Sequence, residues 1–542
     1  MKLAILSLAA LAAGVLGKTG GANCSDKLTV RTSTGSYTGI IDDEFPNTRQ
    51  WRAIPYAEPP LASRRWLPPQ ELQPSEAHRY TPRFPPSCAQ FVTADPAAYF
   101  WASDFTRGNL IYNGGQNDSS GLVGEASSED CLYLAVWAPA ADVPVPEGGF
   151  PVVFFMSGGG FIIGGINIPW QTPTNWVERS QAHIVVSVNY RINIFGFPNS
   201  RGLADEDFSQ NLGILDQRLA LEWVRDNIAA FGGNPERITQ WGRSSGARSA
   251  DIHAFAFHED PIAQGYWLQS GQALGQGLLV NDPSHSNFTF VAEQLGCKVP
   301  SYLNGGEAAK FELDCMRLIP FAEIVNFVGQ YTDRHETPGI AFNILADDKL
   351  IFSDYYGRAA AGLLAHRPII MSTTANEFGS VVPWPEDVTK GPNQTWVDEL
   401  NTIASCTAWN STRIRNALDI PVFRFQHAGV FPNLNVYDWL GAYHSGDTPI
   451  SFGTYHLMDF IAPSTELEIE VSEAMQDYFL SFVKDPYNGP QRDYGWEPMV
   501  TNDPNGGTLL RFGAGGKAVQ YIDGLEVDGV CQGKGEYDSF PT

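Results

Sequence analysis

The sequence predicts an α/β protein with a large, mostly parallel central sheet, helices on both faces and long inserted loops. Two observations support this fold class. Continuous apolar, β-rich runs such as 150–156 (FPVVFFM) and 183–190 (HIVVSVNY) are typical of strands covered on both faces. Segments with helical stretches separate such runs, which favours parallel strands joined through helices.

The elements follow one another in a regular order. Residues 28–150 are rich in turns and prolines, with short strand candidates such as 27–32 (KLTVRT). Residues 216–233 have apolar residues at helical spacing and stop at paired glycines, which predicts a helix. A short strand is expected at 237–242, a helix at 245–257, and further strands at 265–271, 367–373 and 422–427.

The start of the chain and its charge indicate a soluble, secreted, extracellular protein. Residues 1–17 place a lysine before an apolar run and small residues, the layout of a signal peptide cleaved near Gly17, so that 18–542 form a single domain. The net charge of −25 argues against nucleic acid as a partner, because phosphate binding needs clustered cations. No later stretch approaches 18 apolar residues, so no integral membrane association is expected, and the oligomeric state stays open.

Sequons and cysteines agree with export. The N-x-[ST] sequons, expected to be glycosylated, begin at Asn23, Asn117, Asn287, Asn393 and Asn410. None of the seven cysteines forms a CxxC pair, which argues against a zinc ribbon or a thioredoxin-like site. In an oxidising compartment, three disulfides and one unpaired cysteine are the natural count, and spacing alone does not give their connectivity.

Ser244 is the candidate nucleophile. Segment 239–250 (TQWGRSSGARSA) places it between Gly242 and Gly246, where a strand leads into a helix. Active sites of parallel sheets lie at the carboxyl ends of the strands, and a G-x-S-x-G turn there lifts the serine oxygen above the sheet. Among 53 glycines the motif also arises by chance, so a small residue in a tight corner is the alternative.

A serine nucleophile needs a base, and the base needs a carboxylate to orient it. Glu377 follows a predicted strand, and His444 lies in a loop rich in glycine and serine, in the order acid then histidine. His427 is the rival base. A solvated carboxylate and a histidine bound to backbone are the alternative interpretations of Glu377 and His444.

Three glycines follow the strand 150–156, in the segment 156–161 (MSGGGF). Glycines let backbone N–H groups approach a substrate closely, which suits the oxyanion of an acyl-transfer reaction. A hinge and a phosphate cradle are the alternatives. The cradle is disfavoured because no P-loop lysine follows and the net charge is negative.

Taken in chain order, these motifs resemble the type-B carboxylesterase/lipase family, which includes the cholinesterases and several fungal lipases. Further matching segments are 51–60 (WRAIPYAEPP), 128–139 (SEDCLYLAVWAP), 185–197 (VVSVNYRINIFGF), 211–239, 376–380 (NEFGS) and 442–447 (AYHSGD). The resemblance implies the α/β-hydrolase fold and hydrolysis of a small-molecule carboxylic ester through an acyl-enzyme. It implies no metal and no organic cofactor.

The resemblance also assigns residues. Ser244 would be the nucleophile, Glu377 the acid and His444 the base, and backbone N–H groups of Gly159, Gly160 and Ser245 would form the oxyanion hole. The implied disulfides are Cys88–Cys131, Cys297–Cys315 and Cys406–Cys531, with Cys24 unpaired. Buried ion pairs Arg65–Glu129 and Arg191–Asp216 are implied as structural elements.

The chain departs from the family pattern at the reaction centre. Ser157 replaces a common histidine before the glycines, Ser245 replaces alanine, and Phe378 stands where glycine is common. Arg243 replaces the usual glutamate, which disfavours choline esters. It either pairs with a nearby carboxylate or favours substrates that bear a carboxylate or phenolate.

Aromatic residues gather between Cys88 and Cys131, at Tyr99, Phe100, Trp101 and Phe105. They resemble the lid or gorge rim of the family, with packing against the body of the protein as the alternative. The candidates for the substrate pocket are Arg243, Ser157, Phe161 and Trp101. A non-catalytic binding module, or an acyl-transferring homologue acting on a secreted secondary metabolite, is the alternative function. Whether the substrate is a lipid or a small ester stays open.

Overall fold

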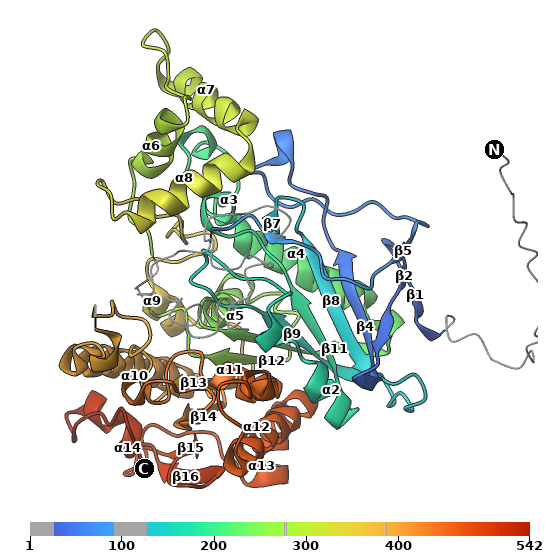
Figure 1. Cartoon of the computed structure of the whole chain (residues 1–542), viewed down its shortest axis with the longest axis vertical. Helices are drawn as coiled ribbons and strands as arrows, with labels where there is room; N and C mark the ends of the chain where they lie inside the picture. The colour runs from blue at the N-terminus through green and yellow to red at the C-terminus, as the bar shows by residue number, and fades with distance from the viewer. Residues whose placement is uncertain (1–26, 92–126, 276, 278, 386) are drawn as a thin grey trace, which may run out of the picture.

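The structure is a computed structural model that describes residues 27–91, 127–275, 277, 279–385 and 387–542. Predictions that fall on residues 1–17, Asn23, Cys24, Asn117 and the aromatic cluster around Trp101 lie outside the described residues. Within them, the chain is built around one large sheet with helices on both sides (Figure 1).

The large sheet has eleven strands in the order β16-β15-β14-β13-β12-β11-β9-β10-β8-β4-β3. Neighbours from β10 to β15 pair in parallel, and the outer strands pair antiparallel, so the predicted mostly parallel sheet is confirmed. Its strands are β3 (Ile40–Asp42), β4 (Phe45–Pro55), β8 (Tyr133–Pro139), β9 (Phe150–Met156), β10 (Ile184–Val188), β11 (Gly233–Arg243), β12 (Gly265–Gln269), β13 (Ile369–Thr374), β14 (Val422–His427), β15 (Thr508–Phe512) and β16 (Val519–Asp523).

Small strands lie outside this sheet, and helices fill most connections. The small strands are β1 (Thr29–Thr32), β2 (Gly35–Thr38), β5 (His78–Tyr80), β6 (Ser87–Cys88) and β7 (Ser127–Ser128). The helices are α2 (Thr174–Ser180), α3 (Asn193–Gly196), α4 (Leu212–Asn227), α5 (Ser245–Ala256), α6 (Ser286–Gln294), α7 (Gly305–Leu318), α8 (Phe321–Asp333), α9 (Tyr355–Ala360), α10 (Gln394–Asn416), α11 (Asp447–Phe452), α12 (Glu466–Lys484), α13 (Gly489–Tyr494) and α14 (Leu525–Asp528). None of the described helices is long and apolar enough to cross a membrane.

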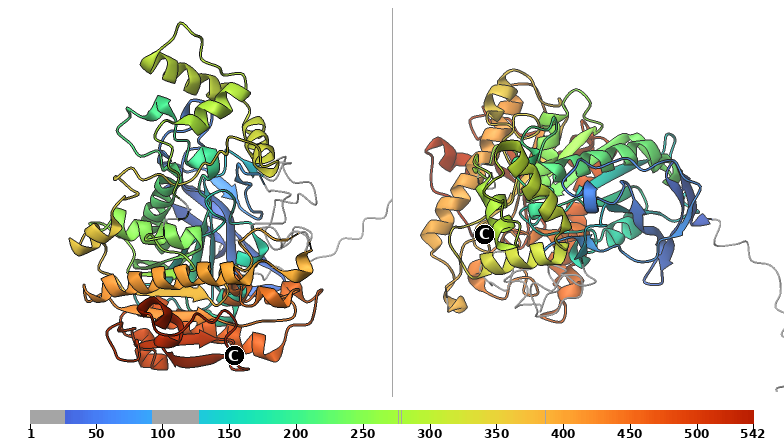
Figure 2. Two further views of the ribbon diagram at one scale, coloured as in Figure 1. Left: turned by 90° about the vertical axis from the view of Figure 1, so that its left-hand side faces the viewer. Right: turned by 90° about the horizontal axis from the view of Figure 1, so that it is seen from above.

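Strand β9 shows how the two faces of the sheet are filled. Val152, Phe154 and Met156 belong to the core cluster that also contains apolar residues of α4, α5 and α10. The intervening Val153 and Phe155 belong to the cluster formed with α2, α11 and α12. Successive side chains of a strand point to opposite faces, so each run of apolar residues supplies both cores at once. Helices α6, α7 and α8 pack together at one end of the molecule (Figures 1 and 2).

Most element boundaries agree with the sequence-based prediction, and one helix differs. The helix expected at 216–233 begins at Leu212 and ends at Asn227, and Gly233 already belongs to β11. Leu212, Gly213 and Ile214 are all buried, so tertiary packing extends the helix toward its N-terminus. At the other end the α-helix tightens into a 3-10 helix over Ile228–Phe231, which ends at Gly232 with a φ of 94°.

The structure contains the covalent and ionic links that the family resemblance implies. The disulfides are Cys88–Cys131, Cys297–Cys315 and Cys406–Cys531. The ion pairs Arg65–Glu129 and Arg191–Asp216 are both buried, with shortest N–O distances of 2.6 and 2.7 Å. Losing one partner of such a pair leaves a buried charge unpaired, at a cost of about 3–5 kcal/mol.

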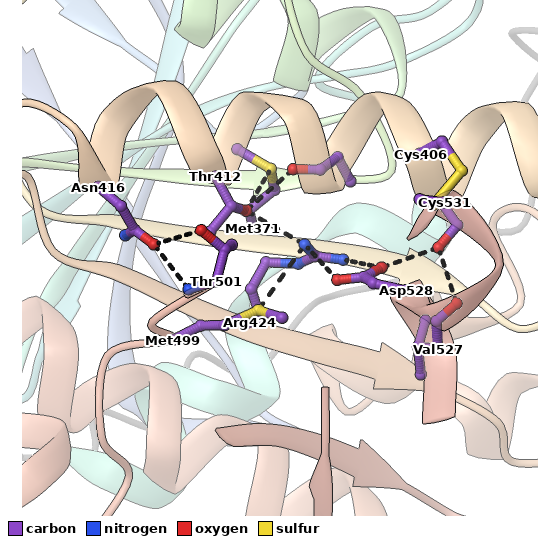
Figure 3. A network of polar contacts seen from close by, with 12 residues as sticks. Met371, Cys406, Thr412, Asn416, Arg424, Met499, Thr501, Val527, Asp528 and Cys531 are labelled. Atoms are coloured by element: carbon purple, nitrogen blue, oxygen red, sulfur yellow. Dashed lines mark hydrogen bonds and ion pairs between the residues drawn. A yellow bond between two sulfur atoms is a disulfide. The ribbon is translucent and has the colours of Figure 1, made fainter. Parts of the chain in front are cut away.

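A further buried network fastens the C-terminal segment to the sheet (Figure 3). Arg424 of β14 donates to the Asp528 carboxylate at 3.1 and 3.3 Å and to Thr412 of α10 at 3.1 Å. The Ser405 hydroxyl donates to Asp528 at 3.0 Å. The Cys406–Cys531 disulfide lies beside this network (Figure 3). The disulfide ties the residues after α14 to α10, and the ion pair ties α14 to β14.

Candidate active site

Ser244 occupies a strained turn between β11 and α5. Its φ of 57° and ψ of −122° are unusual for a residue with a side chain. Such strain persists only where the surroundings over-determine it, which is common at functional sites. The Ser244 amide donates to the Gln269 carbonyl of the neighbouring β12 at 2.7 Å, which anchors the turn at the carboxyl edge of the sheet.

Both glycines of the motif are required by close backbone contacts. A Cβ atom on Gly242 would lie 2.1 Å from the backbone of Gly246, and one on Gly246 would lie 2.1 Å from the Met156 carbonyl oxygen. No real Cβ atom approaches backbone so closely. The bare α carbons therefore let α5 start directly against the end of β9, which is the context that a nucleophile on this type of turn needs.

Glu377 and His444 come from two loops that are held in register. Glu377 follows β13, and His444 lies between β14 and α11. The Asn376 amide donates to the Ala442 carbonyl at 2.8 Å, and Asn376 forms a parallel bridge with Tyr443. This short pairing brings the next residue of each loop, Glu377 and His444, to the same place above the sheet edge.

The three predicted side chains form a continuous hydrogen-bonded chain. His444 Nδ1 lies 2.5 Å from Glu377 Oε2, and His444 Nε2 lies 2.9 Å from Ser244 Oγ. The carboxylate fixes Nδ1 as the protonated nitrogen, so Nε2 can accept the serine proton. Ser244 is 8% exposed and the His444 side chain 11%, so the hydrogen-bonded chain is nearly buried.

The environment keeps Glu377 ionised. Burial raises the pKa of this carboxyl, but the His444 charge and the hydrogen bonds from His444 and the Thr374 amide outweigh burial and hold the pKa below its usual value. The Thr374 amide donates to Glu377 Oε1 at 2.7 Å, while Oε2 serves His444. Each carboxylate oxygen thus has a defined role.

The rival histidine has a different environment. His427 is buried at the end of β14, and burial lowers its pKa to about 4, so it is neutral at physiological pH. The hydrogen bonds to Ser244 and Glu377 belong to His444. Position in the sequence separated these two histidines only weakly, because both follow the serine and lie near the same strand.

The glycine loop lies against Ser244. A Cβ atom on Gly158 would lie 2.6 Å from the Arg243 carbonyl oxygen and 2.9 Å from Ser244 Cβ, so the loop packs directly on the serine turn. The Gly159 carbonyl accepts from the amides of Ile162 and Ile163 at 3.0 and 3.1 Å. Because the C=O and N–H of one trans peptide point in opposite directions, the Gly160 N–H points away from these isoleucines.

The pocket candidates lie in different environments. Arg243 and Ser157 are buried beside Ser244 and the glycine loop. Phe161 is fully buried and packs edge-to-face on Phe197 with ring centroids 5.4 Å apart, so its ring contributes to the core. Trp101 lies outside the described residues.

Arg243 joins the nucleophile turn to the histidine loop. Its guanidinium donates to the Ser445 hydroxyl, next to His444. Asp447 lies in the same region: burial raises the pKa of its carboxyl to about 6, while a hydrogen bond from Gln269 and the Arg243 charge act in the opposite direction. The sequence suggested a carboxylate partner or a substrate anion, and the attraction between Arg243 and Asp447 agrees with the first of these.

An apolar pocket of about 300 Å³ adjoins the glycine loop. Its apolar lining includes Phe91, Ile162, Ile163, Val325, Val328 and Phe342. A larger pocket of about 510 Å³ lies elsewhere, and none of the predicted site residues is among its described lining. Over the described ranges, no group of three or more His, Cys, Asp or Glu side chains is arranged to hold a metal ion.

The fold and the strained serine turn at the carboxyl edge of the sheet define an α/β-hydrolase. A solved PNB esterase has the same fold, with a TM-score of 0.72 and 21% identity over 95% of this chain and all of the other. The model of the carboxylesterase family matches residues 26–410.

Two curated relatives are similar over nearly their whole length. Secreted lipase 5 of Gibberella zeae is 35% identical over 93% of this chain and 94% of its own. Chlorogenic acid esterase of Aspergillus niger is 35% identical over the same shares of the two chains. The chain therefore belongs to the carboxylesterase family and is a carboxylic ester hydrolase.

Proposed function

We propose that the chain hydrolyses carboxylic esters through an acyl-enzyme on Ser244, with His444 as general base and Glu377 as its orienting carboxylate. The observation that carries the proposal is the hydrogen-bonded chain from Ser244 Oγ through His444 to Glu377, with distances of 2.9 and 2.5 Å. Nucleophile, base and orienting group are all within the reach that such catalysis needs.

In the first half-reaction, Ser244 Oγ attacks the acyl carbon while His444 Nε2 takes the hydroxyl proton. The tetrahedral intermediate collapses, and the alcohol leaves with the proton from Nε2. In the second, water attacks the acyl-enzyme, gives a proton to Nε2, and Ser244 recovers it as the acid leaves. Glu377 stays ionised throughout and stabilises the imidazolium.

Backbone N–H groups of Gly159, Gly160 and Ser245 would hold the negative oxygen of each tetrahedral intermediate. The contact of Gly158 with Ser244 supports this assignment, because it brings the glycine loop beside the reacting carbonyl. Ser245 is the first residue of α5, and the N–H groups at a helix start favour negative charge. Losing one such donor costs about 2.7–4 kcal/mol of transition-state stabilisation.

Labelling with a fluorophosphonate tests the nucleophile. The wild-type chain should be labelled, and Ser244→Ala should lose both labelling and hydrolysis of p-nitrophenyl esters. Ser249→Ala is a matched control, because Ser249 is a buried serine one turn further along α5. Labelling that persists in Ser244→Ala would overturn the assignment.

The pocket beside the glycine loop supports a substrate with an apolar acyl or aromatic group. Its lining is largely apolar, and ligand pockets of this size orient such groups with few polar contacts. Val328→Trp should fill part of the pocket and lower kcat/KM for p-nitrophenyl octanoate about tenfold more than for the acetate. Equal losses on both esters would remove the pocket from the substrate path.

Arg243 places a cation one residue from the nucleophile, but its guanidinium is buried and already donates to Ser445, so a preference for esters with an anionic group would act through its charge and without direct contact. The relative named for its action on chlorogenic acid agrees with an acidic substrate, whereas the relative named a lipase does not. Comparing wild-type with Arg243→Ala on neutral and anionic esters of equal size tests this preference. Unchanged discrimination would refute it.

We also propose that residues 1–17 are a signal peptide and that residues 18–542 are secreted as one domain. Two relatives carry the word secreted in their names. Among the sequons in the described part, Asn393 is exposed, while Asn287 and Asn410 are half-buried. Protein recovered from the medium should begin near Lys18, and glycosidase treatment should lower its mass; an intact residue 1 would contradict export.

A further inference from the structure

The glycine loop is held in place by side chains from outside it. Tyr190 donates to the Ser157 carbonyl at 2.6 Å, and Gln90 exchanges two hydrogen bonds with the backbone of Gly164. Between these two fixed points lies the Gly160 carbonyl, which accepts from Asn343 Nδ2 at 2.6 Å. Asn343 therefore holds the middle of the loop, where the proposed oxyanion donors lie.

The orientation of the Asn343 amide is determined by a second hydrogen bond. Its Oδ1 accepts from the Ile344 amide at 2.8 Å. An amide whose oxygen is bound to a backbone N–H must present its NH₂ on the other side. The donor therefore faces Gly160, and an amide flip would place two oxygen atoms against each other.

The segment that carries Asn343 is itself anchored to the body of the fold. Asn211, fully buried at the start of α4, accepts from the Leu345 amide and donates to the Leu345 carbonyl, each at 2.9 Å. The Val280 amide donates to the Ile344 carbonyl at 3.0 Å. A side chain on so firmly held a segment can position a loop that lacks side chains of its own.

The loop needs such positioning because its glycines are free to rotate. Gly159 and Gly160 have φ values of 123° and 63°, and glycine has the widest range of backbone conformations of any residue. The Ile162 and Ile163 amides hold the peptide before the Gly160 α carbon, through the Gly159 carbonyl. Asn343 holds the peptide after it. Both planes that meet at Gly160 are thus fixed.

We infer that Asn343 is a positioning residue that keeps the Gly160 N–H aimed at the oxyanion. The inference rests on the proposed acyl-enzyme function. Asn343 acts through the loop and without touching the reacting atoms, so it should affect the transition state more than substrate binding. No motif in the sequence marks this asparagine, and it lies about one hundred residues from either the serine or the histidine along the chain.

Two substitutions of the same side chain isolate this role. Asn343→Asp keeps an oxygen for the Ile344 amide but places an anionic oxygen against the Gly160 carbonyl. Asn343→Ala removes both bonds. Asn175→Asp is the matched control, because Asn175 Nδ2 donates to the carbonyl of another glycine, Gly453, at 2.5 Å.

The measurements are kcat and KM on p-nitrophenyl esters and Ki for a trifluoromethyl ketone, which forms a tetrahedral adduct with an oxyanion. Asn343→Asp should lower kcat by about tenfold to a hundredfold, less than the loss of a whole donor, and raise Ki by a similar factor. Because Asn343 also lines the apolar pocket, KM is compared on p-nitrophenyl acetate, whose short acyl group leaves that pocket largely empty. On this ester KM should change little, as should the Tm, and Asn175→Asp should keep wild-type kcat and Ki.

Unchanged kcat and Ki in Asn343→Asp would overturn the inference, as would a loss of kcat without a change in Ki. Failure of the proposed function looks different: wild-type protein would then hydrolyse esters without dependence on Ser244. The wild-type and Ser244→Ala rates therefore separate the two failures before any Asn343 variant is compared.

Discussion

Two buried pairs of charged or polar groups lie against the same sheet and differ in what they contact. Glu377 and His444 meet above the carboxyl edge, where one histidine nitrogen faces the carboxylate and the other faces Ser244. Arg424 and Asp528 meet on the face covered by α10, with side chains 0% and 1% exposed (Figure 3). The first pair ends in an imidazole that can take up and release a proton, whereas the second contains a guanidinium that stays charged at physiological pH.

The difference lies in where the remaining hydrogen-bonding capacity goes. Asp528 also accepts from Ser405, and Arg424 also donates to Thr412. The second pair is closed in the sense that these further contacts are to neighbours fixed in the fold, although Arg424 Nε has no hydrogen-bond partner among the described residues. The Glu377–His444 pair is open, because it ends at the hydroxyl of Ser244, the proposed nucleophile. Removing one partner of the closed pair would leave a buried charge and destabilise the native state. The open pair can instead transfer a proton to or from the serine.

The largest expected effect comes from breaking the open pair. Glu377→Gln removes the carboxylate that fixes the His444 tautomer, and kcat on p-nitrophenyl acetate should fall by roughly 10⁴. The Tm should change much less than for a variant of the closed pair. A kcat within tenfold of wild type would contradict the assigned role of Glu377.

Breaking the closed pair, Arg424 and Asp528, should lower stability and leave kcat unchanged. Asp528→Asn leaves the Arg424 charge buried, so the free energy of unfolding should fall by about 3–5 kcal/mol, measured by urea denaturation. The folded fraction should keep its kcat. Replacing both members, Arg424→Met with Asp528→Leu, should recover most of the stability. A double variant no better than the single one would show that packing matters more than charge at this site.

Asp447 sharpens the comparison because it is a buried carboxylate whose pKa lies far above its usual value. Burial raises it to about 6, so this group destabilises the fold progressively as pH rises from about 3.8 to 6, and constantly above that. Asp447→Asn should therefore stabilise the protein by about 1–3 kcal/mol at pH 7 and not at all near pH 3.5. A gain that is the same at both pH values would contradict this origin.

The smallest expected effect is the change with pH in the contribution that Glu377, of the open pair, makes to stability. The pKa of Glu377 is lowered despite its burial, so its contribution to stability is fully present above about pH 4.5 and is lost as pH falls through the lowered pKa. The Tm difference between wild type and Glu377→Gln should be constant from pH 5 to 7 and shrink below pH 4. A difference that grows on acidification would reverse the assigned sign.

The parts of this molecule that follow from local patterns were predictable. Runs such as 150–156 and 422–427 coincide with β9 and β14, because strands buried on both faces require continuous apolar residues. The strand–turn–helix context of Ser244 follows from its glycines. The disulfide partners, in contrast, came only from the family resemblance, because spacing leaves many pairings open.

What could not be predicted depends on contacts distant in the chain. The assignment of His444 over His427 came from the family resemblance, because the bridge between Asn376 and Tyr443 that places His444 is not visible in any local pattern. The start of α4 at Leu212 reflects burial by other elements. The role inferred for Asn343 depends on its contact with Gly160, and the raised pKa of Asp447 depends on burial by other segments. Neither residue stands out in the sequence, because single asparagines and aspartates are common in loops.

The contact between Gly246 and the Met156 carbonyl has a consequence for engineering this scaffold. Residues 242 and 246 tolerate no side chain, so a mutagenesis library aimed at new substrates gains nothing from randomising them and loses every clone it changes. Positions in the apolar pocket, such as Val328, are better targets for randomisation. Their side chains can change size without disturbing the contact between the serine turn and β9.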